Sequence, residues 1–108
     1  MTQAEYSHRH YLKNKPARIA AAKRQRMKLI AEVQSIKDLK PCVDCGIRYR
    51  YWIMQFDHRP GTEKVDTVNR LMLGQGRSAI MKEIEKCDVV CANCHAQRTF
   101  LRQMASLV

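Results

Sequence analysis

The sequence predicts a small α+β domain that is held together by one zinc ion and preceded by basic helices. Two Cys-x-x-Cys pairs, Cys42/Cys45 and Cys91/Cys94, enclose an insert of 45 residues. A chain of 108 residues has room for one small domain and an arm, and a core of that size is marginal without a staple. We therefore expect the zinc-stapled domain to cover residues 42–108.

Residues 1–41 are predicted to form a basic helical arm. They hold ten of the twenty Lys and Arg residues but only three of the ten acidic residues. Thr2 and Glu5 have the spacing of a capping box, which would open a short helix. Pro16 suits the first turn of a second helix, and Pro41 would end it.

The charge of the arm points to a polyanionic partner. The chain carries a formal net charge of +10, and such an excess is typical of proteins that bind nucleic acids. The alternative is a basic but inert surface, because a charge-rich helix is commonly only a solvated face. We favour contact with the DNA backbone, and the arm residues assigned to it are Lys23, Arg24, Arg26 and Lys28.

Residues 42–58 are predicted to form a β-hairpin. The segment from Tyr49 to Phe56 is rich in aromatic and branched residues, which favour strands. Trp52 and Met54 alternate with polar or smaller neighbours along it, so we expect them in the core.

The remaining elements are predicted to be a loop and three helices. Residues 59–64 contain Pro and Gly and should form the loop. Two short helices are expected near residues 65–73 and 78–86, the second with Ser78 as its N-cap. A last helix should run from Ala92 to about Ser106.

The two cysteine pairs predict a closed tetrahedral site with four sulfur ligands. Gly46, directly after the first pair, would relieve crowding in the turned backbone. Two disulfides or four isolated buried thiols are the alternatives. Because a site with four cysteines has no open position, the zinc should be structural. Cys87, the odd cysteine, is expected to be a small buried residue.

The composition favours the cytosol. Residues 1–14 are polar and charged, unlike a signal peptide, and no apolar run approaches the ~20 residues of a membrane span. Five cysteines without an export signal indicate a reducing compartment, where thiols meet metals more often than one another. We expect a bacterial or phage-infected host cytosol and no membrane partner.

Two short motifs contain histidine next to other possible ligands. Phe56-Asp57-His58 ends the predicted second strand, and His95 follows the last cysteine of the second pair directly. Each motif alone means little. Together, with the zinc joining the hairpin to the last helix, they would bring two imidazoles and a carboxylate close together.

With these motifs the sequence resembles the HNH endonuclease family, in its small phage or bacterial form with zinc knuckles. The match runs from Cys42 to about Thr99. It rests on Cys-x-x-Cys-Gly, then Phe-Asp-His, then Val-Cys-Ala-Asn-Cys-His, in the order of that family. The resemblance implies a ββα-metal fold and a hydrolase that cuts DNA to leave a 5′-phosphate and a 3′-hydroxyl. It also implies other phage DNA-processing proteins as partners.

The resemblance assigns His58 as the general base and Asp57 and His95 as ligands of a catalytic divalent ion, Mg²⁺, Mn²⁺ or Ni²⁺. A neutral imidazole can take a proton from water. The sequence departs from the family where an Asn that orients the base is common. Asn93 could take that role or only stabilise the knuckle turn, and Asp88 is a further alternative.

Three arginines near these motifs are candidates for phosphate contact. Arg59 follows the base directly, and Arg98 and Arg102 lie four residues apart on the last helix. A solvated helix face is the alternative for the latter two. Two other functions stay open for the chain: a non-catalytic zinc module that binds nucleic acid with an HNH-like fold, and a zinc interaction scaffold.

Overall fold

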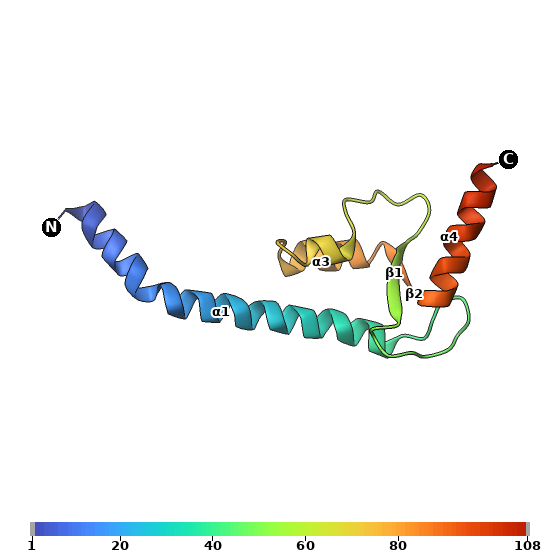
Figure 1. The fold of residues 1–108 in the computed structure, drawn as a ribbon, viewed down its shortest axis with the longest axis horizontal. Helices are drawn as coiled ribbons and strands as arrows, with labels where there is room; N and C mark the ends of the chain where they lie inside the picture. The colour runs from blue at the N-terminus through green and yellow to red at the C-terminus, as the bar shows by residue number, and fades with distance from the viewer. Residues whose placement is uncertain (1, 108) are drawn as a thin grey trace. The chain divides into compact units, whose positions relative to one another are not determined.

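The computed structural model of the 108-residue chain describes residues 2–107 and shows a mixture of helices with one small sheet. Residues 1–31 and 32–108 form two compact units, whereas the sequence placed the boundary after residue 41. The elements in chain order (Figure 1) are α1 (Gln3–Leu39), β1 (Met54–His58), α2 (Val68–Leu71), α3 (Arg77–Ile84), β2 (Cys87–Cys91) and α4 (Ala92–Ser106).

Helix α1 is a single helix and not the two that were predicted. The capping box is confirmed, because Glu5 N donates to Thr2 Oγ1 at 3.1 Å and Thr2 N donates to Glu5 Oε2 at 3.2 Å. Pro16 lies inside the helix, where it removes one backbone hydrogen bond and favours a bend rather than a break. Figure 1 shows such a bend in the N-terminal half of α1.

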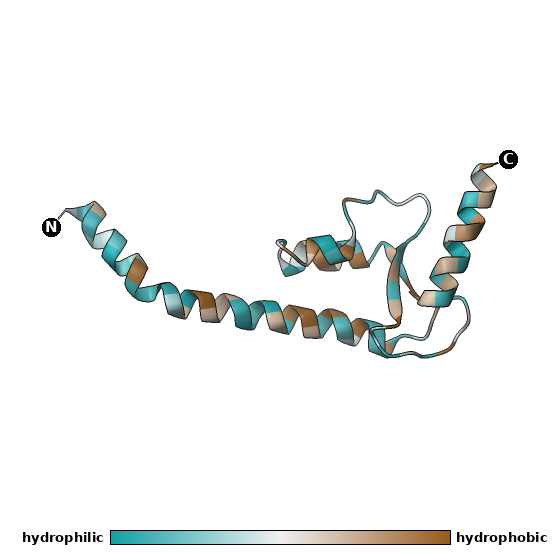
Figure 2. Ribbon diagram, in the orientation of Figure 1, coloured by the Kyte–Doolittle hydropathy of each residue, from teal (hydrophilic) through white to brown (hydrophobic). Residues whose placement is uncertain are grey.

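The first unit presents a mixed surface. Figure 2 shows hydrophilic and hydrophobic residues alternating along α1, and Lys23, Arg24 and Lys28 are exposed. In residues 2–107 no helix combines the length and the apolar composition that a membrane crossing requires.

The last turns of α1 belong to the second unit and are tied to it by hydrogen bonds. Arg77, at the start of α3, donates to Glu32 from Nε at 2.9 Å and from Nη2 at 2.5 Å. Asp38 accepts from Tyr51 N at 2.7 Å. The first contact ties the end of α1 to α3, and the second ties it to the loop that leads into β1.

The sheet has two antiparallel strands, β1 and β2, with Met54 opposite Cys91 and His58 opposite Cys87. The predicted hairpin over residues 42–58 is wrong, since β1 pairs with a strand at the end of the insert. Strand β2 was not predicted, because residues 87–90 fell between the helix predicted over residues 78–86 and the second knuckle. Non-local pairing of this kind leaves no signal in either segment alone.

The core forms where the sheet meets the first knuckle. Cys42, Met54, Val89, Val90 and Cys91 are buried together. Three of them are consecutive in β2, so this end of the strand is covered on both faces. Trp52 was expected there, but it is 63% exposed. The backbone turns just before β1, and the Trp52 ring lies under the guanidinium of Arg50 at 4.8 Å instead.

A second buried group lies between α2 and α3. Val68 and Leu71 of α2 and Ile80 and Ile84 of α3 are buried, at the spacing of one apolar helix face. Helix α3 is capped by Gly76 rather than Ser78. Helix α4 matches its predicted bounds, and Cys91 is its N-cap. This arrangement places the start of α4 beside the end of β2.

Candidate functional site

The four cysteines of the two pairs converge on one point. Their sulfur atoms all lie within 4.8 Å of one another, and Cys45 Sγ is 4.0 Å from Cys91 Sγ. Four thiolates around one zinc ion, each about 2.3 Å from it, stand about 3.8 Å apart. The cluster could therefore hold a metal ion such as zinc with little adjustment.

The first knuckle is a tight turn closed by backbone hydrogen bonds. Cys42 N donates to Ile47 O at 2.9 Å, and Gly46 N donates to Cys42 O at 2.8 Å. A Cβ on Gly46 would meet no atom within 4 Å, so the predicted crowding is not the reason for glycine. The reason is its φ of 74°, which other residues adopt only with strain.

Backbone N–H groups point at the sulfur atoms, as expected of a site for thiolates. Cys91 N donates to Cys42 Sγ at 3.3 Å and Cys94 N donates to Cys91 Sγ at 3.4 Å. Burial opposes ionisation of Cys42, but N–H groups outweigh it and lower its pKa to about 6. The interaction with Cys91, together with burial, raises the pKa of Cys94 to about 12. One ionised thiol opposes ionisation of its neighbours. A bound cation would stabilise the four thiolates together and remove this opposition.

Cys87 lies outside the cluster and is buried, as predicted. Its Sγ donates to Glu83 O at 3.4 Å. Burial, with a smaller contribution from the charge of Glu83, raises its pKa to about 11. An inert, protonated thiol suits a packing role.

Asp57 is the most heavily bonded carboxylate near the cluster. Its side chain is 5% exposed. Arg102 donates to both of its oxygens at 2.8 Å, and Arg98 Nη1 donates to Oδ2 at 2.8 Å. Burial opposes ionisation of Asp57, but these hydrogen bonds outweigh it and lower the pKa to about 2. The carboxylate is therefore ionised near neutral pH.

Arg98 joins three acidic residues from three parts of the fold. It donates to Asp44 in the first knuckle at 2.6 and 2.7 Å, to Asp57 of β1, and to Asp88 of β2 at 3.0 Å. These bonds use all three guanidinium nitrogens of Arg98 and most of the five N–H donors of its side chain. Its position favours a structural role over the phosphate contact proposed from the sequence.

His95, on the first turn of α4, lies beside Asp57. His95 Nε2 is 3.7 Å from Asp57 Oδ1, within the span of two ligands that share one divalent ion at about 2.1 Å each. The arginines occupy three of the roughly four lone-pair positions of the carboxylate. The remaining one belongs to Oδ1, the oxygen that faces His95. Asp57 Oδ1 and His95 Nε2 could therefore bind a hard cation together. Arg102 would compete with that cation for the carboxylate.

His58 is held by a residue that the sequence did not reveal. His58 Nε2 lies 2.8 Å from Glu83 Oε2, and the Glu83 side chain is 2% exposed. Lys86 Nζ and Val65 N also donate to this carboxylate, at 2.8 and 3.0 Å. The hydrogen bond from Lys86 contributes most to a pKa of about 2 for Glu83; burial opposes it, and the bonds from His58 and Val65 reinforce it.

A sequence signal for Glu83 did exist. It stands three residues after Ile80 and directly before Ile84, on the apolar face of a predicted helix. A carboxylate on such a face needs partners. In the structure His58 and Lys86 supply them.

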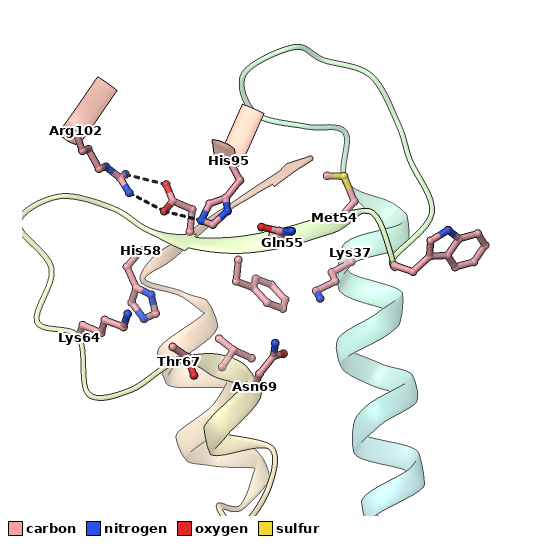
Figure 3. A pocket seen from close by; sticks show the side chains of 13 residues that line it. Lys37, Met54, Gln55, His58, Lys64, Thr67, Asn69, His95 and Arg102 are labelled. Atoms are coloured by element: carbon pink, nitrogen blue, oxygen red, sulfur yellow. Dashed lines mark hydrogen bonds and ion pairs between the residues drawn. The ribbon is translucent and has the colours of Figure 1, made fainter. Parts of the chain in front are cut away.

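Asp57, His58, His95 and Arg102 line one pocket of about 730 Å³ (Figure 3). All five residues of β1 contribute to its wall, so the pocket runs along the edge of β1 that does not pair with β2. Figure 3 shows His58 and Lys64 on one side of the strand and His95 and Arg102 on the other. Lys37 also lines it, half-buried, and burial lowers its pKa. Among the charged side chains that line this pocket, the cationic ones outnumber the single carboxylate of Asp57.

The other sequence candidates have positions or partners of their own. Asn93 is exposed on the first turn of α4, and Asp88 accepts from Arg98 at 3.0 Å. Arg59 donates to Cys87 O at 3.0 Å and also to Glu85 O, so the backbone before β2 holds its guanidinium. His58 therefore has Glu83 as its partner, and neither Asn93 nor Asp88.

Among the described residues 2–107, the four cysteines are the one group of three or more His, Cys, Asp or Glu side chains that could hold a metal ion. Asp57 and His95 supply two ligands only. Comparison of the chain with protein-family models, curated proteins and solved structures gives no match.

Proposed function

We propose that this chain is a metal-dependent HNH DNA endonuclease whose fold is stapled by zinc. The observation that carries the proposal is the shared pocket of Asp57, His58 and His95, beside a four-cysteine cluster that could hold zinc. The sequence motifs resemble the HNH family at these same residues. Zinc suits the cluster because thiolates in a closed tetrahedron are its preferred structural ligands.

His58 has the partner that a general base needs. Glu83 is ionised, with a pKa of about 2, so it can only accept a hydrogen bond. His58 Nε2 must therefore carry the proton that points at Glu83, which leaves Nδ1 of the neutral ring unprotonated. Nδ1 is the atom that would take a proton from the attacking water.

Asp57 Oδ1 and His95 Nε2 would hold the divalent ion. When bound, such an ion stabilises negative charge on a phosphate and on the leaving 3′ oxygen. Two protein ligands leave positions for water and for the substrate, unlike the closed cysteine cluster.

The surroundings of the pocket suit a phosphodiester. Lys37, Lys64 and Arg102 line it, with Asp57 as the single acidic side chain in its wall. The basic arm would hold the DNA backbone through contacts to its phosphates. By resemblance to the family, the products carry a 5′-phosphate and a 3′-hydroxyl.

A non-catalytic module that binds nucleic acid is the second candidate. The observation in its favour is the double arginine contact on Asp57, which satisfies the carboxylate without any ion. The two candidates predict different behaviour toward DNA in the presence of a divalent metal.

Plasmid cleavage by the zinc-loaded protein separates them. We expect wild type to nick or linearise supercoiled plasmid in Mg²⁺, Mn²⁺ or Ni²⁺, and His58→Ala to lose at least about 100-fold in rate. His8→Ala, in α1, is the matched control and should cut like wild type. Equal, intact plasmid with wild type and His58→Ala in all three metals would leave the binding module as the function.

A further inference from the structure

The two arginines on Asp57 are held in very different ways. Arg98 bonds to three carboxylates and its side chain is 19% exposed. Arg102 bonds to Asp57 and its side chain is 46% exposed. Arg98 is therefore a fixed part of the fold, whereas Arg102 can leave Asp57 by rotating its own side chain into solvent.

Arg102 lies so close to the Asp57 carboxylate that its charge disfavours the binding of a cation there. Its Nη1 is 2.8 Å from Oδ1, the same oxygen that lies 3.7 Å from His95 Nε2. An ion about 2.1 Å from Oδ1 would be within about 5 Å of this guanidinium nitrogen. Two cations at that separation in a half-buried pocket repel each other.

We propose that Arg102 is a latch that occupies Asp57 while no divalent ion is bound, and that the ion releases it to bind the phosphate of the DNA. This inference rests on the proposed nuclease function and assigns a regulatory and substrate-binding role to one residue. The latch keeps Asp57 Oδ1, to which Arg98 does not donate, hydrogen-bonded in the free protein, which avoids the cost of an unsatisfied buried carboxylate oxygen.

The released guanidinium has a new partner in the same pocket. Arg102 and His58 both line it, and a phosphate bound in this pocket is the anion that would take the place of Asp57. Guanidinium binds phosphate oxygens through two parallel N–H donors, the same fork that it presents to Asp57. On release, Arg102 would thus exchange a bidentate contact with the Asp57 carboxylate for a bidentate contact with the phosphate.

Mn²⁺ binding by the zinc-loaded protein tests the latch without any cleavage. Free Mn²⁺ is counted by electron paramagnetic resonance during titration of wild type, Arg102→Gln, Arg102→Lys and Lys64→Gln. We expect Arg102→Gln to bind Mn²⁺ at least about 10-fold more tightly than wild type. Arg102→Lys, which keeps the charge but not the fork, should lie between them.

Lys64→Gln is the matched control, because Lys64 is a pocket cation whose removal changes the charge equally. It should bind Mn²⁺ like wild type. Equal tightening by Lys64→Gln would overturn the latch in favour of a general charge effect, and so would unchanged binding by Arg102→Gln.

Two further outcomes separate the latch from the function it rests on. If Asp57→Asn binds Mn²⁺ as well as wild type, or if no variant binds it, the ion site and the nuclease proposal both fall. If Arg102→Gln binds tightly but cuts plasmid at the wild-type rate in saturating Mn²⁺, the phosphate role is overturned. We expect that rate to fall at least about 10-fold.

Discussion

The contact between His58 and Glu83 determines which ring nitrogen can act as a base. Glu83 lies on α3 and His58 at the end of β1, and their side chains meet at 2.8 Å. Lys86 holds the other carboxylate oxygen at 2.8 Å, so the carboxylate cannot rotate away. In the proposed nuclease, Glu83 would act through His58 as a positioning residue.

Replacing Glu83 by Gln should lower kcat about 10-fold. An amide can donate as well as accept a hydrogen bond, so it no longer fixes the proton on His58 Nε2. The rate of plasmid cleavage in saturating divalent metal measures this loss.

Glu85→Gln is the control for this experiment, because Glu85 is an exposed neighbour on the same helix end. It should leave kcat unchanged. A wild-type kcat in Glu83→Gln would mean that Glu83 is only part of the packing.

Sequence reasoning predicted Asp57, His58 and His95 as a group, and the structure brings them to one pocket. The prediction was possible because these residues lie in compact motifs next to zinc knuckles. Glu83 and the Arg98 contacts to Asp44 and Asp57 were not predicted, because they depend on side chains that meet across 25 to 54 residues. No local pattern encodes such a meeting.

At the scale of elements, some local signals were reliable and the strand pairing was not predicted. The Ala92 start of α4 follows from Cys91 as an N-cap, and the Thr2 capping box opens α1, whereas Pro16 and Ser78 did not start helices. The strand Cys87–Cys91 contains two adjacent valines, but its partner β1 is distant in the sequence. The pairing becomes evident only when the knuckles bring Cys42 and Cys91 together.

The basic arm should bind the DNA backbone without reading its sequence. Neutralising Lys23, Arg24, Arg26 and Lys28 to Gln should weaken DNA binding. It should also reduce the slope of log Kd against log salt, by up to about 0.9 for each phosphate that the arm no longer neutralises. Fluorescence anisotropy with a labelled duplex over a range of NaCl concentrations measures both.

Lys82→Gln serves as the control here, since Lys82 is exposed on α3 in the other unit. It should change the salt slope little. A slope that stays at the wild-type value after all four arm substitutions would exclude the arm from the interface.

At the scale of the whole molecule, the four-cysteine cluster joins segments that share only a small core. The core around Cys42, Met54 and Val90 is small, and α4 has no buried residue among those described. Binding of structural zinc in small domains supplies about 10–16 kcal/mol of apparent free energy. The second unit should therefore require zinc to fold.

Cys94→Ser should release zinc and abolish the near-UV circular dichroism of the second unit, while α1 keeps part of the far-UV helical signal. Cys87→Ser is the matched control, because Cys87 is buried outside the cluster. It should retain zinc and the native spectrum. A native near-UV spectrum in Cys94→Ser, after zinc release has been verified by elemental analysis, would contradict the staple.

One small fold would thus hold two metal ions with different tasks: a zinc clamp at four cysteines and a divalent ion at Asp57 and His95. Anomalous diffraction from crystals of the zinc-loaded protein soaked in Mn²⁺ tests this most directly. We expect a zinc peak among the four Sγ atoms, a manganese peak between Asp57 Oδ1 and His95 Nε2, and Arg102 turned away. A saturating soak with no manganese peak there, and Arg102 still on Asp57, would contradict the second ion.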